Sequence, residues 1–146
     1  MQKLNLPSFD YKLSKKQEKI YIFDVIRAKN ICLFPEEWVR QHFIHFLLNN
    51  QYPKTLFQVE KGLKYHSLSK RSDILVYDRQ LKPFLLVECK APNIPIGTQT
   101  MEQALTYNSQ IQAKYIILSN GIEHFIWQNH SEFGFQILEI LPIFPE

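Results

Sequence analysis

The stretch Asp73–Lys90, DILVYDRQLKPFLLVECK, constrains the fold more than any other part of the sequence. It holds two short apolar runs, Ile74–Tyr77 and Phe84–Val87, on either side of a polar segment. Continuous apolar runs of this length are typical of strands that are buried on both faces of a sheet. The stretch therefore predicts a hairpin at the centre of a sheet, with its turn near residues 78–82.

Three charged residues flank these apolar runs. Asp73 precedes the first run, and Glu88 and Lys90 follow the second. Side chains alternate across a strand, so Glu88 and Lys90 share one face. A turn centred on residues 80–81 places Asp73 opposite Glu88 on the neighbouring strand. Two facing carboxylates repel each other unless a positive charge lies between them, and that charge is either Lys90 or a divalent cation that assists it.

The residues alone leave two interpretations of this charged group open. The first is a lysine–carboxylate network at a solvated sheet edge, which is the usual environment of charges on strands. The second is a metal site, since Mg²⁺ is commonly held by one or two carboxylates together with waters and phosphate oxygens. The apolar runs beside the charges favour buried central strands and therefore the second interpretation.

The remaining pattern predicts a mixed sheet with two helices. The helices are expected over Phe34–Asn50, where Pro35 suits the first turn, and over Thr98–Ala113. Further strands are expected at Lys19–Lys29, at Thr55–Tyr65 with a candidate bulge at Gly62, in two segments of Lys114–Trp127 joined by a type I′ turn at Asn120-Gly121, and at Phe133–Leu141. This order predicts an α/β or α+β fold.

Composition indicates one globular domain. The chain has 146 residues, of which 45% are hydrophobic and 14% aromatic, and this is enough for a single packed core. Residues 1–18 are polar and rich in lysine, so we expect a loosely attached N-terminal arm before a single domain over residues 19–146. The net charge of +3 is compatible with nucleic-acid binding without requiring it.

Several classes of function are disfavoured by the sequence. Its apolar runs fall short of the ~20 residues of a membrane span, and its first 19 residues lack an apolar signal core, so no membrane association is expected. Only two cysteines occur, Cys32 and Cys89, which favours a reducing, cytoplasmic location. No G-x-x-x-x-G-K-[ST] loop is found, so the chain carries no P-loop motor of its own.

The charged hairpin and its neighbours resemble a nuclease family. Asp73 and the later VECK resemble the PD-(D/E)XK motif, although Ser72 stands where the motif has proline. The segments PEEWVRQHF, KRSDILVYDR, LLVECKAP, QALTYN and LSNG resemble the N-terminal nuclease domain of type I restriction enzyme R subunits, in a short, free-standing form. The similarity covers roughly residues 19–127 and implies a restriction-endonuclease-like fold, in which helices flank a mixed central sheet.

This resemblance implies a Mg²⁺-dependent DNA endonuclease in which Mn²⁺ can substitute. Asp73 and Glu88 would hold the metal, and Lys90 would polarise the scissile phosphate or position the attacking water. Lys70 and Arg71 precede Asp73 and are candidates for phosphate contacts, with simple solvation as the alternative.

The resemblance also implies a carboxylate on the first helix. We assign it to Glu36, which precedes Arg40 by four residues, and we expect Glu37 to be a solvated acid in the first turn; helix capping is the alternative role for this pair. Gln103 and Tyr107 resemble a Gln-x-x-x-Tyr element that lies beside the metal site in related nucleases, with an ordinary polar pair as the alternative.

The implied partners are DNA and, on other chains, motor or specificity subunits. A homodimer would supply the two active sites that cutting both DNA strands usually needs. The alternative function is a catalytically silent nuclease-fold module that binds DNA or a partner protein, because the chain lacks a motor and a recognisable sequence-reading motif.

Overall fold

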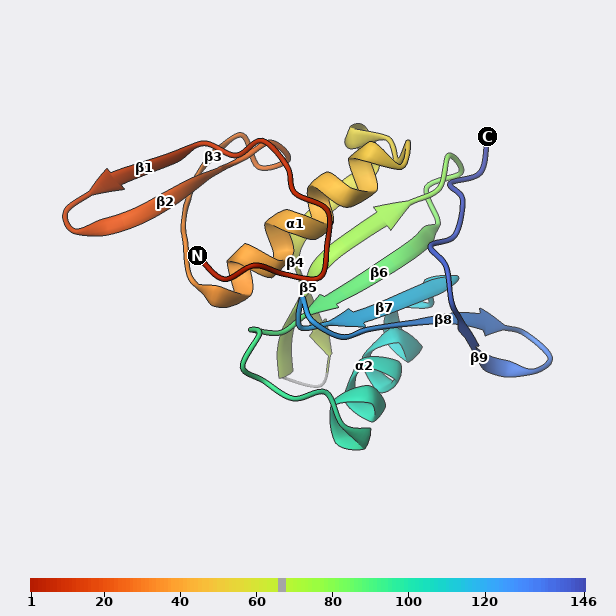
Figure 1. Cartoon of the computed structure of the whole chain (residues 1–146). Coiled ribbons are helices and arrows are strands. Elements are labelled where there is room, and N and C mark those ends of the chain that lie inside the picture. Colours follow the sequence, from red (N-terminus) through yellow and green to blue (C-terminus); the bar gives the residue numbers. More distant parts are fainter. Residues whose placement is uncertain (66–67) are drawn as a thin grey trace.

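The computed structural model describes residues 1–65 and 68–146, with only the backbone described over residues 61–65 and 68–72 (Figure 1). The elements of this part are β1 Leu13–Lys16, β2 Lys19–Asp24, β3 Lys29–Cys32, α1 Pro35–Asn49, the 3₁₀ helix η1 Lys54–Leu56, β4 Phe57–Tyr65, β5 Leu68–Tyr77, β6 Pro83–Cys89, α2 Thr98–Ile111, β7 Tyr115–Ser119, β8 His124–His130 and β9 Gly134–Leu138. The predicted α+β class is confirmed.

The strands form two sheets. The larger sheet has the spatial order β4-β5-β6-β7-β8-β9, and the smaller one has the order β1-β2-β3. Within the larger sheet β6 and β7 run parallel, while the other neighbouring strands run antiparallel. A parallel pair requires a long crossover, and α2 lies within it. The mixed sheet expected from the sequence is therefore present.

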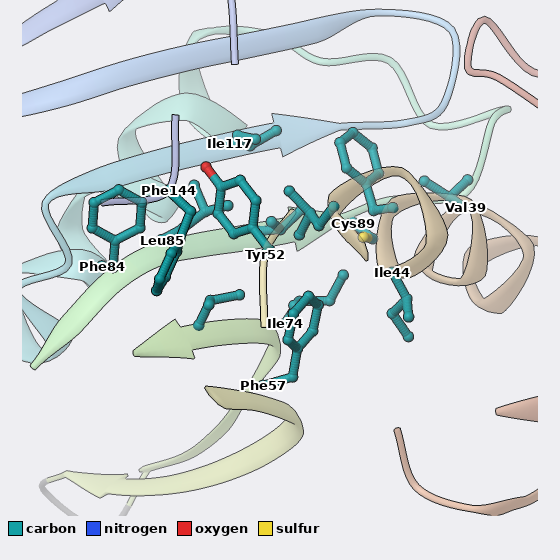
Figure 2. Close-up of a cluster of buried hydrophobic side chains, with 14 of the residues drawn as sticks. Val39, Ile44, Tyr52, Phe57, Ile74, Phe84, Leu85, Cys89, Ile117 and Phe144 are labelled. Carbon is teal, nitrogen blue, oxygen red and sulfur yellow. The ribbon is translucent and has the colours of Figure 1, made fainter. Parts of the chain in front are cut away.

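The two helices cover opposite faces of the larger sheet (Figure 1). Side chains alternate along the central strands, so each helix meets every second residue. Ile74 and Leu85 share one core cluster with Val39 of α1 (Figure 2). On the opposite face, Leu86 packs with Tyr107 of α2. The central strands are thus buried on both faces, as their apolar runs predicted.

Helix α1 forms as expected and packs one apolar stripe against the sheet. Pro35 occupies its first turn, where a missing N–H costs nothing. Val39, Phe43 and Leu47, spaced four residues apart, are at most 2% exposed. Within the described part of the chain, no helix has both the length and the apolar character needed to cross a membrane.

The central hairpin adopts the predicted register over its apolar runs. Ile74 pairs with Val87 and Val76 with Leu85, and the register shifts only where the strands approach the turn. Asp78 shapes this turn, because its Oδ1 accepts hydrogen bonds from the backbone N–H groups of residues 80 and 82 at 2.9 and 3.0 Å. Continued by one residue, the register sets Asp73 opposite Glu88.

The expectation of one strand over Lys19–Lys29 is wrong, because β2 ends at Asp24 and a turn separates it from β3, which begins at Lys29. Asp24 causes the division: its Oδ1 accepts hydrogen bonds from the backbone N–H groups of Ile26 and Arg27 at 2.7 and 2.8 Å. Ala28 completes the turn with a φ of 55°. The β-branched residues of this segment favour a strand, so the sequence pattern did not reveal the turn.

The bulge expected at Gly62 is also wrong. Gly62 pairs with Arg71 in a register that continues unshifted from the pairs before it. The irregular residue of β4 is instead Glu60, whose φ of 55° lies in the left-handed region.

The N-terminal segment is attached to the domain rather than loose. Leu4 is buried, and the backbone N–H of Asn5 donates to the carbonyl of Gly121 at 2.7 Å. Gly121 permits this approach, because a Cβ there would meet Leu4 at 2.9 Å. Residues 13–16 add β1 to the smaller sheet. The division into an arm and a domain stays a prediction.

The turn at Asn120-Gly121 joins β7 and β8 as expected, but its type differs from the prediction. A type I′ turn needs positive φ at both central residues, and in this pair only Gly121 has it, with a φ of 87°. Asn120 acts through its side chain, because its Oδ1 accepts hydrogen bonds from the N–H groups of Ile122 and Glu123 at 2.9 and 2.8 Å.

Two isoleucines provide a matched test of the core. Ile117 of β7 is 1% exposed within the α1-side cluster, whereas Ile143 is 90% exposed. We expect Ile117→Ala to lower the free energy of unfolding by about 2–5 kcal/mol, because it removes packed methyl groups and leaves a cavity. Ile143→Ala should change it by less than about 0.5 kcal/mol. Urea titrations measure both values, and equal losses would contradict this core.

Candidate functional site

Asp73 and Glu88 lie on neighbouring strands at the end of the central hairpin, each one residue beyond the paired residues Ile74 and Val87. Both side chains are buried, at 8% and 3% exposed. The Oδ2 atom of Asp73 accepts a hydrogen bond from the backbone N–H of Cys89 at 2.8 Å, so β6 itself positions this carboxylate. Lys90 follows and is half-buried, and its backbone N–H donates to Ser119 of β7 at 2.8 Å. The structure thus brings the three residues of the predicted motif together at one end of the strands.

Arg40 of α1 reaches this end of the sheet and contacts Asp73 directly. Its Nη2 lies 2.5 Å from Asp73 Oδ1, and its Nη1 lies 2.6 Å from Glu37 Oε1. The side chain is only 1% exposed. Burial by itself would lower the pKa of Arg40, but the charges of Asp73 and Glu37 raise it above its ordinary value. Arg40 is therefore a permanent buried cation between helix and strand.

Glu37 is buried, so the expectation of a solvated acid in the first turn of the helix is wrong. Its side chain is 1% exposed. Besides Arg40, Glu37 Oε2 accepts hydrogen bonds from Arg27 Nη2 at 2.9 Å and from Gln41 Nε2 at 3.0 Å. Three donors thus compensate its burial. The i,i+3 spacing of Glu37 and Arg40 was visible in the sequence, but the contribution of Arg27 depends on the tertiary fold.

Arg27 ties the β2–β3 turn to the same group of charges. It lies 2.7 Å from Asp24 Oδ2 and 3.3 Å from Glu60 Oε2. Burial alone would raise the pKa of Asp24, but hydrogen bonds from Arg27 lower it overall. The left-handed backbone at Glu60 lets its carboxylate lie between Arg27 and Arg40, 3.5 Å from the latter. We call this set the arginine network: Asp24, Arg27, Glu37, Arg40, Glu60 and Asp73.

Glu36 stands on the solvent-accessible side of the site. Its side chain is 36% exposed, and its Oε2 lies 3.4 Å from Arg40 Nη2. Burial raises the pKa of Glu36, and the charge of Asp73 raises it further, while Arg40 and Lys90 oppose the shift. Glu36 therefore feels the charges of both Asp73 and Lys90. This position agrees with our choice of Glu36 over Glu37 as the helix carboxylate, and the choice stays a prediction.

The remaining predicted residues occupy different surroundings. Tyr107 is buried against Leu86 on the α2 side, the sheet face that strand alternation also gives to Glu88 and Lys90. Gln103 lies one helical turn earlier and is exposed. The side chains of Lys70 and Arg71 lie outside the described part of the structure, so their proposed phosphate contacts stay predictions.

Cys89 lies in the α1-side core, on the opposite face of β6 from Glu88, as strand alternation predicted (Figure 2). Burial raises the pKa of the Cys89 thiol well above its ordinary value, and the nearby charge of Asp73 raises it further. The thiol therefore stays protonated at neutral pH and acts as a small apolar core residue.

The oxygen atoms that the site offers as ligands decide whether a hard cation fits here. Among the residues that the structure describes, no group of three or more His, Cys, Asp or Glu side chains is arranged as a metal site. Both oxygens of Asp73 already accept a hydrogen bond, and each keeps a further lone pair. The two carboxylates of Asp73 and Glu88 could therefore hold Mg²⁺ only where waters or phosphate oxygens complete its coordination, which is the usual arrangement for this ion.

The fold is α+β, and the candidate site combines the carboxylates of Asp73 and Glu88 with Lys90 at the end of two central strands. The chain matches the family described as type I restriction enzyme R protein N terminus over residues 35–142. It belongs to this family, as its motifs predicted, which relates it to restriction nucleases. A search of curated proteins finds no match.

We predict that Glu36 lowers the stability of the fold at neutral pH. Its raised pKa means that the folded state favours the protonated carboxyl, so stability falls as the pH rises from the ordinary value of 4.5 through the raised pKa. In EDTA buffer, Glu36→Gln should melt at a higher temperature than wild type at about pH 7, with the gain vanishing below about pH 4. Glu102→Gln, at an exposed α2 position, is the control. A lower melting temperature for Glu36→Gln at about pH 7 would contradict the prediction.

We predict that Arg40 is coupled energetically to Glu37. Arg40→Met leaves Glu37 and Asp73 without their buried partner, so we expect a loss of about 3–5 kcal/mol, whereas Arg79→Met at an exposed position should cost far less. The double variant Arg40→Met/Glu37→Gln also removes one of the carboxylate charges that Arg40 compensates. Its loss of unfolding free energy should therefore be smaller than the sum of the two single losses. Additive losses in urea unfolding would refute the coupling.

Proposed function

We propose that this chain is a Mg²⁺-dependent DNA endonuclease of the PD-(D/E)XK type that hydrolyses phosphodiester bonds, with Mn²⁺ as a substitute metal. The observation that carries the proposal is the burial of Asp73 and Glu88 on neighbouring central strands, each one residue beyond the paired Ile74 and Val87, with Lys90 two residues beyond Glu88. Membership of the restriction enzyme family supports DNA as the substrate. Motor or specificity subunits on other chains, and a second copy of this chain, are the partners we propose.

The proposed mechanism assigns a distinct task to each side chain. Asp73 and Glu88 would hold the metal, which supplies Lewis-acid stabilisation of charge on the phosphate and a more acidic bound water. Arg40 and the Cys89 N–H fix the Asp73 carboxylate in one orientation, so little reorganisation is needed when the metal binds.

Lys90 and Glu36 act on the substrate side in this proposal. The Lys90 ammonium is a compact cation that neutralises charge developing on the scissile phosphate. Glu36 is a carboxylate near both Asp73 and Lys90, and its raised pKa suits a group that accepts a proton from the attacking water.

One observation favours a second candidate, a catalytically silent module that binds DNA or a partner protein. Arg40 already pairs with Asp73 and neutralises part of the acidic group, so Asp73 has a compensating partner within the protein itself. Incubating the purified protein with plasmid and short duplexes in Mg²⁺, Mn²⁺ or EDTA separates the two candidates. Cleavage with Mg²⁺ or Mn²⁺ that stops in EDTA supports the enzyme, and DNA binding without cleavage supports the silent module.

We predict that Asp73→Asn and Glu88→Gln weaken Mg²⁺ binding without unfolding the protein. Each substitution keeps the shape of the side chain but removes the negative charge that binds a hard cation. Calorimetric titration measures the affinity, and a thermal melt checks the fold of each variant. Unchanged affinity in both folded variants would refute the metal assignment.

We predict that Lys90→Ala reduces the cleavage rate by about 10²-fold or more, because it removes one charge contact made in the transition state. Mg²⁺ affinity should persist, since lysine is not a metal ligand. The control is Lys82→Ala, an exposed lysine in the turn at the opposite end of the hairpin. A Lys90→Ala protein that melts at a lower temperature yet retains wild-type specific activity would instead indicate a purely structural lysine.

A further inference from the structure

Residues 12–19 are one of two strongly basic segments of the chain, the other being residues 61–71, with four basic and no acidic residues. Residues 12–19, KLSKKQEK, hold four lysines and one glutamate. The whole chain has 17 basic and 14 acidic residues, so 13 of each sign remain outside this segment. The net charge of +3 therefore equals that of residues 12–19 alone. The functional assignment above uses none of these lysines.

This segment forms most of a ribbon of β1 and β2 that extends away from the body of the protein, with β3 paired only along its base, at Tyr21–Asp24 (Figure 1). Strands β1 and β2 pair in an antiparallel register that ends at Lys16 and Lys19. The two turn residues, Gln17 and Glu18, have φ values of 52° and 69°, which is the left-handed pair that a tight hairpin turn requires. All residues of β1 are exposed.

The two faces of the ribbon differ in character. Ile22 faces the protein core and is fully buried. Residues paired across strands share a face, so the opposite face carries Lys16 and Lys19, together with Ser14 and Tyr21. The outward face therefore combines exposed ammonium groups with hydroxyl groups that can donate hydrogen bonds.

Lys12 extends this outward face toward the base of the ribbon. Its carbonyl accepts a hydrogen bond from the N–H of Phe23, which places Lys12 beside Phe23 on the lysine face. Lys12, Ser14, Phe23 and Asn30 line a shallow hollow of about 170 Å³ together with Leu13. We call Lys12, Lys16 and Lys19 the ribbon lysines.

The base of the ribbon is fixed relative to the candidate site. Arg27, in the turn that follows β2, contacts both Glu37 and Glu60. Gln41 of α1 donates to Asp24 Oδ2 at 2.9 Å from the other side. These contacts belong to the arginine network that also holds Asp73, so the ribbon and the site are parts of one ion-paired framework. In Figure 1 the ribbon extends on the side toward which β6 runs, where α1 also begins.

We infer that the β1–β2 ribbon is a DNA-binding arm whose ribbon lysines contact backbone phosphates next to the site. This inference rests on the proposed function for its substrate and adds where the DNA is held. Lysine ammonium groups on an exposed surface are the usual source of phosphate contacts and of salt-dependent affinity. The tip of the ribbon, beyond Tyr21, has only two strands and is narrow enough to enter the major groove of a duplex.

The test is the salt dependence of DNA binding, measured in EDTA so that cleavage does not contribute. The variant is Lys12→Gln/Lys16→Gln/Lys19→Gln, and the ligand is a short fluorescent duplex followed by anisotropy between about 50 and 200 mM salt. Three lost phosphate contacts should reduce the slope of log affinity against log salt by about 2.7. The melting temperature should not change, because the ribbon lysines are exposed.

A matched control removes three lysines elsewhere, by Lys54→Gln/Lys82→Gln/Lys114→Gln. These residues are exposed and lie near the opposite end of the central strands from Glu88. The control has the same change in net charge, so it should lose much less of the salt slope than the ribbon variant. Equal losses in the two variants, or an unchanged slope in the ribbon variant, would overturn the inference.

Further measurements separate this inference from the proposed function. Ribbon-dependent DNA binding without Mg²⁺-dependent cleavage supports the arm and counts against the nuclease. Mg²⁺-dependent cleavage together with DNA binding that does not depend on the ribbon lysines supports the nuclease and counts against the arm. Vesicles of phosphatidylserine and phosphatidylcholine test a membrane surface as the partner. Ribbon-dependent vesicle binding with unaltered DNA binding would overturn the DNA assignment.

Discussion

The buried guanidinium of Arg40 is the interaction on which the rest of the structure depends. Four carboxylates, those of the buried Glu37 and Asp73 and of the more exposed Glu36 and Glu60, lie around it where helix α1 meets strands β4 and β5. Burying an unpaired carboxylate costs several kcal/mol, so these acids coexist only because a permanent cation lies between them. Arginine suits this position because its planar fork binds two carboxylates at once and does not lose its proton. The acidic site is therefore assembled by the protein itself.

The arginine network also links parts of the chain that are distant in sequence. Arg27 connects the β2–β3 turn to α1 through Glu37, and Arg40 connects α1 to β5 through Asp73. The helix carboxylate and the strand carboxylates thus keep a fixed relation to one another. The raised pKa of Glu36 shows that this arrangement retains some unfavourable charge. Such local cost is common at functional sites, where geometry is kept at the expense of stability.

The local pattern of the sequence was enough to predict the central hairpin and helix α1. Apolar runs and strand alternation gave the register that sets Asp73 beside Glu88, because that register depends on a short turn. The burial of Glu37 and the role of Glu60 were not predictable in this way. They depend on Arg27, which reaches them only after the smaller sheet has packed on α1. The division of β2 from β3 was missed because a single side chain, that of Asp24, outweighs the strand propensity of its neighbours.

The parallel pairing of β6 with β7 has a consequence for the order in which the chain folds. β6 meets β5 through a short turn, but it meets β7 only after α2 has crossed the sheet. Contacts that are close in sequence form early, whereas a crossover must first close a long loop. We therefore expect a partly folded chain to hold Asp73 and Glu88 together before the Lys90 backbone is fixed by Ser119. Exchange of the Lys90 amide proton during refolding would report this late step, so the site as a whole would be assembled only when the fold is complete.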